Sequence, residues 1–158
     1  MATTPKVGAK VPDFSLPASG DGGTWRLKDA KGQKVVLYFY PKDMTTGCTR
    51  ESQDFRDLHA RFRKAGVRIV GVSRDSVASH EKFKTKENLP FELLSDADEK
   101  VCKAFDVIKE KSLYGRKYLG IERSTFLLDA AGVLRQEWRK VKVPGHAEEV
   151  LEAAKSPS

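Results

Sequence analysis

The chain has 158 residues, a length that corresponds to about one domain and leaves no room for two ordinary ones. Hydrophobic residues make up 39% of the composition and charged residues 32%, so the chain can bury a core and is not expected to be disordered. The net charge of +7 suits nucleic acid, acidic proteins or anionic substrates and selects none of these partners. We therefore expect one folded domain over residues 1–158.

The first ten residues lack the apolar segment of a secretory signal, and no segment approaches the roughly 18 consecutive apolar residues of a transmembrane helix. We expect a soluble, cytoplasmic protein. The two cysteines, Cys48 and Cys102, are too few for a disulfide scaffold, and they lack the paired spacing of a zinc site or a thioredoxin-type redox motif. If a cysteine has a chemical role in this protein, it acts singly.

The first predicted element is an N-terminal β-hairpin, because turn-forming residues 19–23 separate two short segments, 14–16 and 24–27. Residues 35–40 (VVLYFY) then form a continuous apolar run closed by Pro41. Such a run is typical of a strand that is covered on both faces. We expect this strand to lie at the centre of a sheet.

A helix is predicted from Cys48 to Lys64, because Phe55, Leu58 and Phe62 share one face and Gly66 is placed to end the helix. The pattern continues with a strand at 67–73, a helix at 77–87, a strand at 92–94 and a helix near 97–105. Residues 124–129 and 133–138 flank an Ala-Ala-Gly turn and predict a second hairpin, and 146–154 predicts a closing helix. This order indicates a three-layer α/β sandwich with a mixed central sheet.

Cys48 stands in the first turn of the predicted helix, with Thr45 or Thr46 as the N-cap. Unpaired backbone N–H groups and the helix dipole favour a thiolate there, and helix N-termini lower thiol pKa values from about 8.5 to between about 3.5 and 7.5. Seven residues separate Cys48 from Phe55, which places the sulfur on the core-facing side, in a shallow pocket. A free cysteine with only a packing role also suits this position, so position alone leaves both readings open.

The segment from Pro41 to Thr49 (PKDMTTGCT) resembles the active-site signature of the peroxiredoxins, Pro-x-x-x-Thr-x-x-Cys, and specifically that of the PrxQ subfamily, also called bacterioferritin comigratory proteins. Residues 7–16 (VGAKVPDFSL), 55–57 (FRD) and 115–129 (GRKYLGIERSTFLLD) are similar to further segments of that subfamily, in the same order. The resemblance covers nearly the whole chain. It implies a thioredoxin-like fold and the reduction of hydrogen peroxide and organic hydroperoxides by a peroxidatic cysteine, here Cys48.

The resemblance also implies roles for the residues around this cysteine. The hydroxyl of Thr45 would contact the peroxide, Pro41 would shield the pocket, and Arg123 would place a cation beside the thiolate. Each residue also has a purely structural reading, as a helix cap, a strand terminator and an exposed arginine respectively. Glu51, one turn into the helix, either orients Arg123 or simply favours the positive end of the helix dipole.

A lower thiol pKa does not by itself produce a fast reaction. A shift from about 8.5 to about 6 raises the thiolate fraction at neutral pH roughly thirtyfold, but the less basic thiolate loses roughly tenfold in nucleophilicity. The rate is therefore expected to depend on groups that stabilise the charge on the departing oxygen. The candidates are the guanidinium of Arg123, the hydroxyl of Thr45 and the backbone N–H groups of Gly47 and Cys48.

The second half of the cycle needs a thiol that reacts with the sulfenic acid on Cys48. Many PrxQ proteins have a resolving cysteine five residues further on, where this chain has Gln53, and Thr46 replaces a common proline of the loop. Cys102 belongs to an apolar helix face, where packing is favoured over a resolving role. We expect a one-cysteine cycle in which an external thiol, from glutathione with glutaredoxin or from thioredoxin, reduces Cys48.

Two other functional classes are alternatives. A thioredoxin-like disulfide exchanger would share the fold, but the position three beyond Cys48 holds Glu51 in place of a second cysteine. A nucleic-acid-binding module would suit the charge, but the basic residues are interspersed with acidic ones. The histidines, His59, His80 and His146, show no metal spacing and are expected at the surface; no metal or cofactor is inferred. We expect a monomer without a nucleic-acid or membrane partner.

Overall fold

The computed structural model describes residues 4–19 and 23–156. Within these residues no helix combines the length and the apolar content needed to cross a membrane. In chain order the elements are β1 (Ser15–Pro17), β2 (Thr24–Arg26), the 3-10 helix η1 (Leu27–Ala30), β3 (Lys34–Phe39), α1 (Thr46–Asp57), α2 (His59–Lys64), β4 (Val67–Ser73), α3 (Val77–Glu87), β5 (Glu92–Ser95), α4 (Lys100–Ala104), β6 (Ile108–Leu113), β7 (Arg116–Ile121), β8 (Ser124–Leu128), β9 (Leu134–Trp138) and α5 (His146–Lys155).

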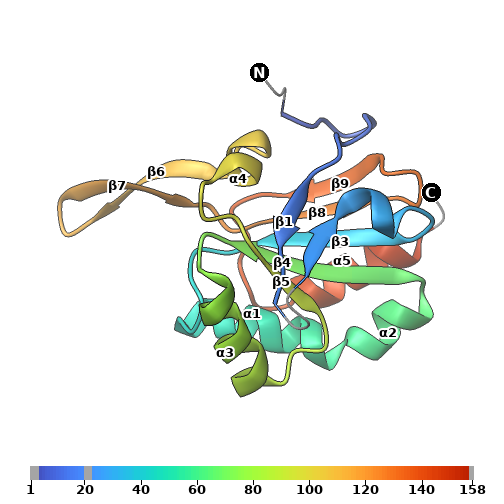
Figure 1. Cartoon of the computed structure of the whole chain (residues 1–158), viewed down its shortest axis with the longest axis horizontal. Coiled ribbons are helices and arrows are strands. Elements are labelled where there is room, and N and C mark those ends of the chain that lie inside the picture. Colours follow the sequence, from blue (N-terminus) through green and yellow to red (C-terminus); the bar gives the residue numbers. More distant parts are fainter. Residues whose placement is uncertain (1–3, 20–22, 157–158) are drawn as a thin grey trace.

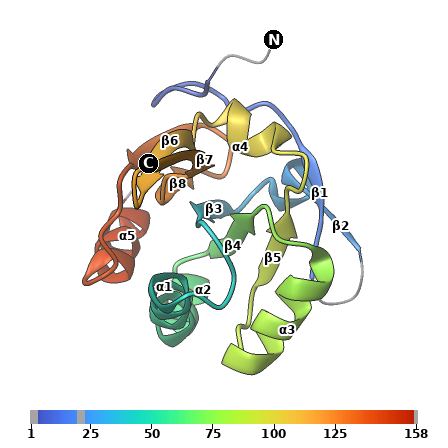
Figure 2. The same cartoon turned by 90° about the vertical axis from the view of Figure 1, so that its left-hand side faces the viewer.

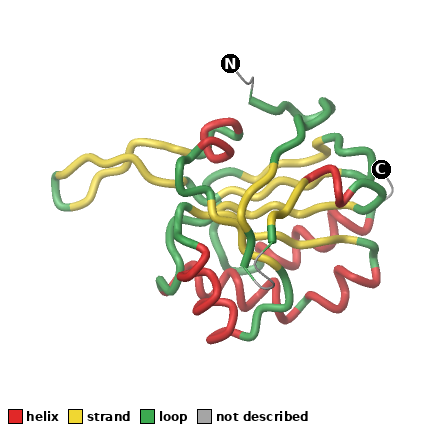
Figure 3. The backbone as a smooth tube through the Cα atoms, viewed as in Figure 1, coloured by secondary structure: helices red, strands yellow, loops and turns green. Residues whose placement is uncertain are grey.

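A five-stranded mixed sheet with the order β5-β4-β3-β8-β9 forms the centre of the molecule (Figure 3). The strand predicted to be central, β3, runs parallel to β4 and antiparallel to β8, so that Leu37 pairs with Val70 on one side and with Phe126 on the other. All residues from Val35 to Phe39 are buried. This burial on both faces explains why the segment is an uninterrupted apolar run.

The two faces of the sheet carry separate layers, which confirms the predicted sandwich and its thioredoxin-like fold. The helices α1, α2, α3 and α5 cover one face, while α4, η1 and the β1-β2 hairpin lie on the other (Figures 1 and 2). Alternate side chains of β3 enter alternate cores: Val36 and Tyr38 pack in one cluster, and Leu37 and Phe39 in the other. Residues on opposite faces of β3 are thus separated by the sheet itself.

The structure corrects the boundaries of two predicted helices. The helix predicted from Cys48 to Lys64 begins two residues earlier and is divided into α1 and α2 at Leu58, whose backbone (φ −100°, ψ 2°) leaves the helical conformation. The helix predicted near 97–105 is limited to α4, because Glu99 adopts a left-handed conformation (φ 66°) immediately before it. The N-terminal hairpin is confirmed by the β1-β2 pairing, although residues 20–22 of its turn lie outside the described residues.

The hairpin formed by β6 and β7 was not predicted from the sequence. It extends away from the body of the molecule (Figure 1), and its turn consists of Tyr114 (φ 52°) and Gly115 (φ 77°). Two left-handed residues are what a tight two-residue hairpin turn requires. Apart from Gly120 and Ile121 at the end of β7, no residue of the two strands is buried, so the sequence carries no burial pattern that would predict them. Exposed large apolar side chains line the hairpin: Leu113, Tyr114, Tyr118 and Leu119.

Candidate active site

The loop that leaves β3 places Cys48 at the start of α1. Thr45 is the N-cap residue and has an extended backbone, so Cys48 is the third residue of the helix, in its first turn, as predicted. The backbone N–H groups of Thr46, Gly47 and Cys48 belong to the helix start, where no preceding turn supplies carbonyl partners. Together with the helix dipole they favour a negative charge on the sulfur.

Arg123 supplies a second favourable group for a negative sulfur. It lies in the short connection between β7 and β8, and its Nη2 donates a hydrogen bond to the Sγ of Cys48 at 3.3 Å. Its Nη1 donates to Oε1 of Glu51 at 2.6 Å, within a buried ion pair. One guanidinium therefore bridges a thiol and a carboxylate on consecutive turns of α1. Of the two readings left open for Glu51, this geometry supports the orientation of Arg123.

Burial controls the protonation of this ion pair. It raises the pKa of Glu51 from 4.5 to about 7, although the charge of Arg123 acts in the opposite direction. Within the described residues, the second oxygen of Glu51 is buried without a hydrogen-bond partner, so the carboxylate is only partly compensated. Burial alone would lower the pKa of Arg123, but Glu51 and Cys48 outweigh it and raise that pKa. The guanidinium stays charged beside the sulfur.

Cys48 lies on the core-facing side of α1, as predicted, but it is buried more deeply than the expected shallow pocket. Only 1% of this residue is exposed, and it packs in the same core cluster as Phe55 and Phe62. The spacing of seven residues that places the sulfur on the core-facing side of α1 also explains why it is covered. At this exposure, a second thiol-bearing molecule can reach the sulfur only after a movement that uncovers it.

The other predicted pocket residues surround the same helix start. Thr45 is exposed, and its hydroxyl donates to the carbonyl of Lys42 at 2.9 Å in place of a bond to the helix. Pro41 is half-buried where β3 ends. A Cβ atom added to Gly47 would lie 3.2 Å from Nη2 of Arg123, so the absence of a side chain there lets the guanidinium approach the helix start closely.

Cys102 lies on α4 and is fully buried, which agrees with its predicted packing role. It belongs to the core on the opposite face of the sheet from Cys48. Burial raises its pKa well above the ordinary value, and the nearby carboxylate of Asp96 adds to that effect. Gln53, at the position of the resolving cysteine in many PrxQ proteins, donates a hydrogen bond to Glu87 at 2.8 Å.

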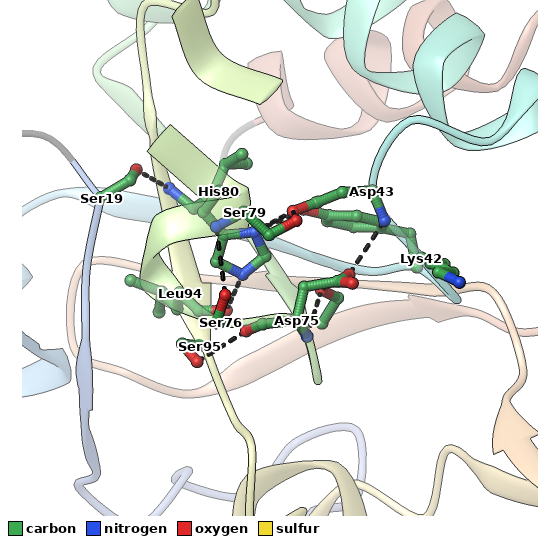
Figure 4. A network of polar contacts seen from close by, with 12 residues as sticks. Ser19, Lys42, Asp43, Asp75, Ser76, Ser79, His80, Leu94 and Ser95 are labelled. Atoms are coloured by element: carbon green, nitrogen blue, oxygen red, sulfur yellow. Dashed lines mark hydrogen bonds and ion pairs between the residues drawn. The ribbon is translucent and has the colours of Figure 1, made fainter. Parts of the chain in front are cut away.

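The structure contains a buried polar network that the sequence did not predict (Figure 4). It joins Asp43, from the loop before α1, to Asp75 in the connection between β4 and α3 and to Ser79 and His80 at the start of α3. The ligand atoms of Asp43, Asp75 and His80 lie within 4.8 Å of one another, close enough for a metal ion. However, Asp43 and His80 already use these atoms in hydrogen bonds inside the protein, and an acidic cluster alone does not make a metal site.

The expected surface position of the histidines is wrong for two of them. His80 is fully buried, and both ring nitrogens have partners. His146 is buried at the start of α5, where its Nε2 lies 2.8 Å from the hydroxyl of Thr125, and burial lowers its pKa to about 4. Both residues are on helix faces that pack against the sheet. In a helix with charges on several sides, the sequence does not show which face a single histidine occupies.

A further cation near the site was also missed. Lys111, on β6, donates to the carbonyl of Ile121, two residues before Arg123. Burial lowers the pKa of Lys111, and the charge of Arg123 lowers it further, while Cys48 acts in the opposite direction. The base of the projecting hairpin thus adds a second basic group to the surroundings of the sulfur.

Comparison with known proteins gives consistent matches over most of the chain. The model of the AhpC/TSA family matches residues 7–137. Peroxiredoxin Bcp of Bacillus subtilis is 54% identical over 156 residues, covering 98% of both chains. The structure is similar to that of PrxQ from Xylella fastidiosa (TM-score 0.91, 44% identity, 97% of both chains). It is also similar to the Xanthomonas campestris bacterioferritin comigratory protein, described for its alkyl peroxide reduction activity (TM-score 0.85, 55% identity, 90% of both chains).

Proposed function

The chain belongs to the AhpC/TSA family and, within it, to the PrxQ peroxiredoxins, so it is a thiol-dependent peroxidase, and we propose that Cys48 is the residue that attacks the peroxide. The observation that carries this assignment is the contact between Arg123 Nη2 and Cys48 Sγ, 3.3 Å long, at the start of α1. It combines a fixed cation with a helix start around one sulfur. Cys102 lacks such surroundings, because the charged group that acts most strongly on its thiol is the carboxylate of Asp96, which raises the pKa.

In the first step the thiolate of Cys48 attacks one oxygen of the hydroperoxide. An S–O bond forms, the O–O bond breaks, the sulfur loses two electrons, and the departing oxygen takes a proton to leave as an alcohol or as water. The products are a sulfenic acid on Cys48 and the reduced peroxide. Because the Xanthomonas campestris relative is described as reducing alkyl peroxides, organic hydroperoxides join hydrogen peroxide as the proposed substrates.

Charge moves from sulfur to oxygen in this step, so the groups that matter are those that face both atoms. Arg123 stabilises the thiolate first and the departing oxygen later, and Glu51 holds its guanidinium in place. The hydroxyl of Thr45 donates a hydrogen bond to the carbonyl of Lys42, so the lone pairs of its oxygen can accept a hydrogen bond from the peroxide.

We further propose that the cycle uses one cysteine of this chain and an external thiol. The thiol attacks the sulfenic acid, forms a mixed disulfide with Cys48 and releases water; a second thiol then breaks that disulfide and restores the cysteine. Glutathione with glutaredoxin and thioredoxin are the candidate reductants. The chain is proposed to act as a monomer.

Two measurements test these assignments. Peroxide consumption is expected in wild type and in Cys102→Ser and to be lost in Cys48→Ser; activity that survives Cys48→Ser refutes the assignment of the reactive sulfur. Mass spectrometry after one equivalent of peroxide with glutathione is expected to find glutathione on Cys48. A disulfide between Cys48 and Cys102 would refute the one-cysteine cycle.

A further inference from the structure

The burial of Cys48 creates a conflict between the two halves of the cycle. The helix start must be closed for Arg123 and the backbone N–H groups to act on the peroxide, yet an external thiol is too large to reach a sulfur that is 1% exposed. The start of α1 must therefore open after the first step. Contacts that hold this segment closed determine how often that happens.

Asp43, five residues before Cys48, is fixed to the body of the protein by four hydrogen bonds. Its backbone N–H donates to Asp75 at 2.9 Å. Its carboxylate accepts hydrogen bonds from Tyr40 at 2.6 Å, from Ser79 at 2.8 Å and from His80 at 2.7 Å. Tyr40 directly follows β3, Asp75 lies between β4 and α3, and Ser79 and His80 lie in the first turn of α3. Figure 4 shows the side chains of Ser79 and His80 pointing toward the carboxylate of Asp43.

The contact between His80 and Asp43 is buried on both sides. Nε2 of His80 donates to the carbonyl of Leu94 at 2.9 Å, so this nitrogen carries a hydrogen. Nδ1 lies 2.7 Å from Oδ2 of Asp43, whose carboxyl group also accepts hydrogen bonds from Tyr40 and Ser79. His80 is fully buried and Asp43 is 5% exposed, so loss of this hydrogen bond leaves a buried polar group without a partner, which costs more than the same loss at the surface.

The segment that follows is under strain. Met44 is exposed and has a left-handed backbone (φ 64°), which is unfavourable for a residue with a side chain. Beyond Cys48, the helix is attached again through Glu51 to Arg123 and through Ser52 to Tyr38. The segment between the two attachments carries the sulfur, and release of Asp43 would relieve the strain at Met44.

We propose that Asp43 and His80 form a positioning pair that keeps the start of α1 closed over Cys48 and so sets how often a second molecule reaches the sulfur. The pair touches neither the peroxide nor Cys48, and it acts through the loop. This proposal rests on the assignment of Cys48 as the reactive residue.

Two substitutions of His80 distinguish its hydrogen bond to Asp43 from the mere filling of space by its side chain. In His80→Asn the amide nitrogen takes the place of Nδ1 and can still donate to Asp43, whereas in His80→Gln it takes the place of Nε2 and can donate only to Leu94. The probe is dithiodipyridine, a bulky neutral disulfide, and its reaction with each cysteine of the reduced protein is followed by mass spectrometry. Modification of Cys48 is expected to become about tenfold faster in His80→Gln, the change that follows when a buried polar group loses its hydrogen-bond partner.

Cys102 is the internal control for global unfolding, because it is fully buried on the opposite face of the sheet. Its modification rate is expected to stay within about twofold of wild type in both variants, and Cys48 in His80→Asn is expected to react at nearly the wild-type rate. Turnover limited by the external thiol should rise in His80→Gln, while the initial reaction with hydrogen peroxide stays within about twofold as long as the closed form predominates.

Three outcomes overturn the proposal: an unchanged Cys48 rate in His80→Gln, equal acceleration in both His80 variants, or parallel acceleration of Cys102. If His80→Gln does not fold, Ser79→Ala serves instead, because it removes one hydrogen bond to Asp43 from a half-buried position. Modification of Cys48 is expected to become about fivefold faster in Ser79→Ala. An unchanged rate in this variant would refute the role of the pair. Loss of peroxidase activity in Cys48→Ser tests the function separately, since probe labelling does not require turnover.

Discussion

Arg123→Lys is the substitution that best tests the proposed chemistry. The guanidinium contacts Glu51 and Cys48 through two different nitrogens, at 2.6 and 3.3 Å, and a lysine ammonium has a single nitrogen. The variant keeps the positive charge but loses the bridge, and the ammonium is expected to remain with the buried carboxylate of Glu51. Removal of one donor aimed at developing charge costs about 3 kcal/mol, so peroxide reduction should slow roughly a hundredfold.

Rapid-mixing kinetics with limiting hydrogen peroxide measure this rate, and the ultraviolet absorbance of the thiolate gives the ionised fraction of Cys48 in the same samples. A change in that fraction alone alters the rate only a few-fold, because a less basic thiolate is also a weaker nucleophile. Arg135→Lys is the matched control, since Arg135 pairs with Asp129 away from the site. A rate within threefold of wild type, or a loss that the thiolate fraction fully explains, would refute the role given to the bridge.

Three further predictions concern residues around the site and in the core. Gly47→Ala should slow the peroxide step roughly tenfold without loss of fold in circular dichroism, because the new Cβ displaces the guanidinium of Arg123 from its place 3.2 Å away; an unchanged rate contradicts this. Cys102→Ser should keep the wild-type rate but lower the free energy of unfolding in urea by about 1–2 kcal/mol, since a hydroxyl replaces a sulfur in an apolar core. For Glu51, the pKa of about 7 in the folded protein exceeds the ordinary 4.5, so its contribution to stability is complete below pH 4.5 and is lost as the pH rises through 7, a change of about 3 kcal/mol. His146, with its pKa lowered from 6.5 to about 4, contributes in the opposite sense, since its stabilisation is lost as the pH falls through 4. Glu51→Gln should therefore gain stability, relative to wild type, as the pH rises from 4 to 7, and equal pH profiles in urea denaturation would contradict this.

The sequence predicts the elements whose stability comes from burial and fails for those that depend on other interactions. The segment that forms β3 is apolar without interruption because both faces of the strand are covered, and the prediction for α3 agrees with its observed bounds, Val77–Glu87. The β6-β7 hairpin projects from the body, so its strands need no buried face and leave no apolar period. The hairpin is marked locally by its turn, in which Tyr114 and Gly115 both adopt left-handed conformations. The conformation of Tyr114 is known only from the structure, so the turn was not predicted.

The candidate site divides in the same way. The position of Cys48 at a helix start follows from local patterns, but its partner Arg123 lies 75 residues away and was found only through the family resemblance. Asp43 and His80 are 37 residues apart, and neither belongs to a motif of its own, so only the fold brings them to 2.7 Å. The core-facing position of Cys48 follows from its spacing to Phe55, but the extent of its burial, with 1% exposed, depends on the tertiary packing around α1.

The arrangement of the two cysteines links the fold to the chemistry of recycling. Alternate residues of β3 face alternate cores, and Cys48 packs with Val36 and Tyr38 while Cys102 packs with Leu37 and Phe39. A disulfide requires Cα atoms within about 7 Å, so a bond between these cysteines would require α1 or α4 to leave its face of the sheet. Opening of the first turn of α1 disrupts far less packing and exposes one sulfur to solvent. We therefore expect a chain with this placement of cysteines to depend on a thiol from outside, and we expect the contacts that hold the loop before α1 to limit its turnover.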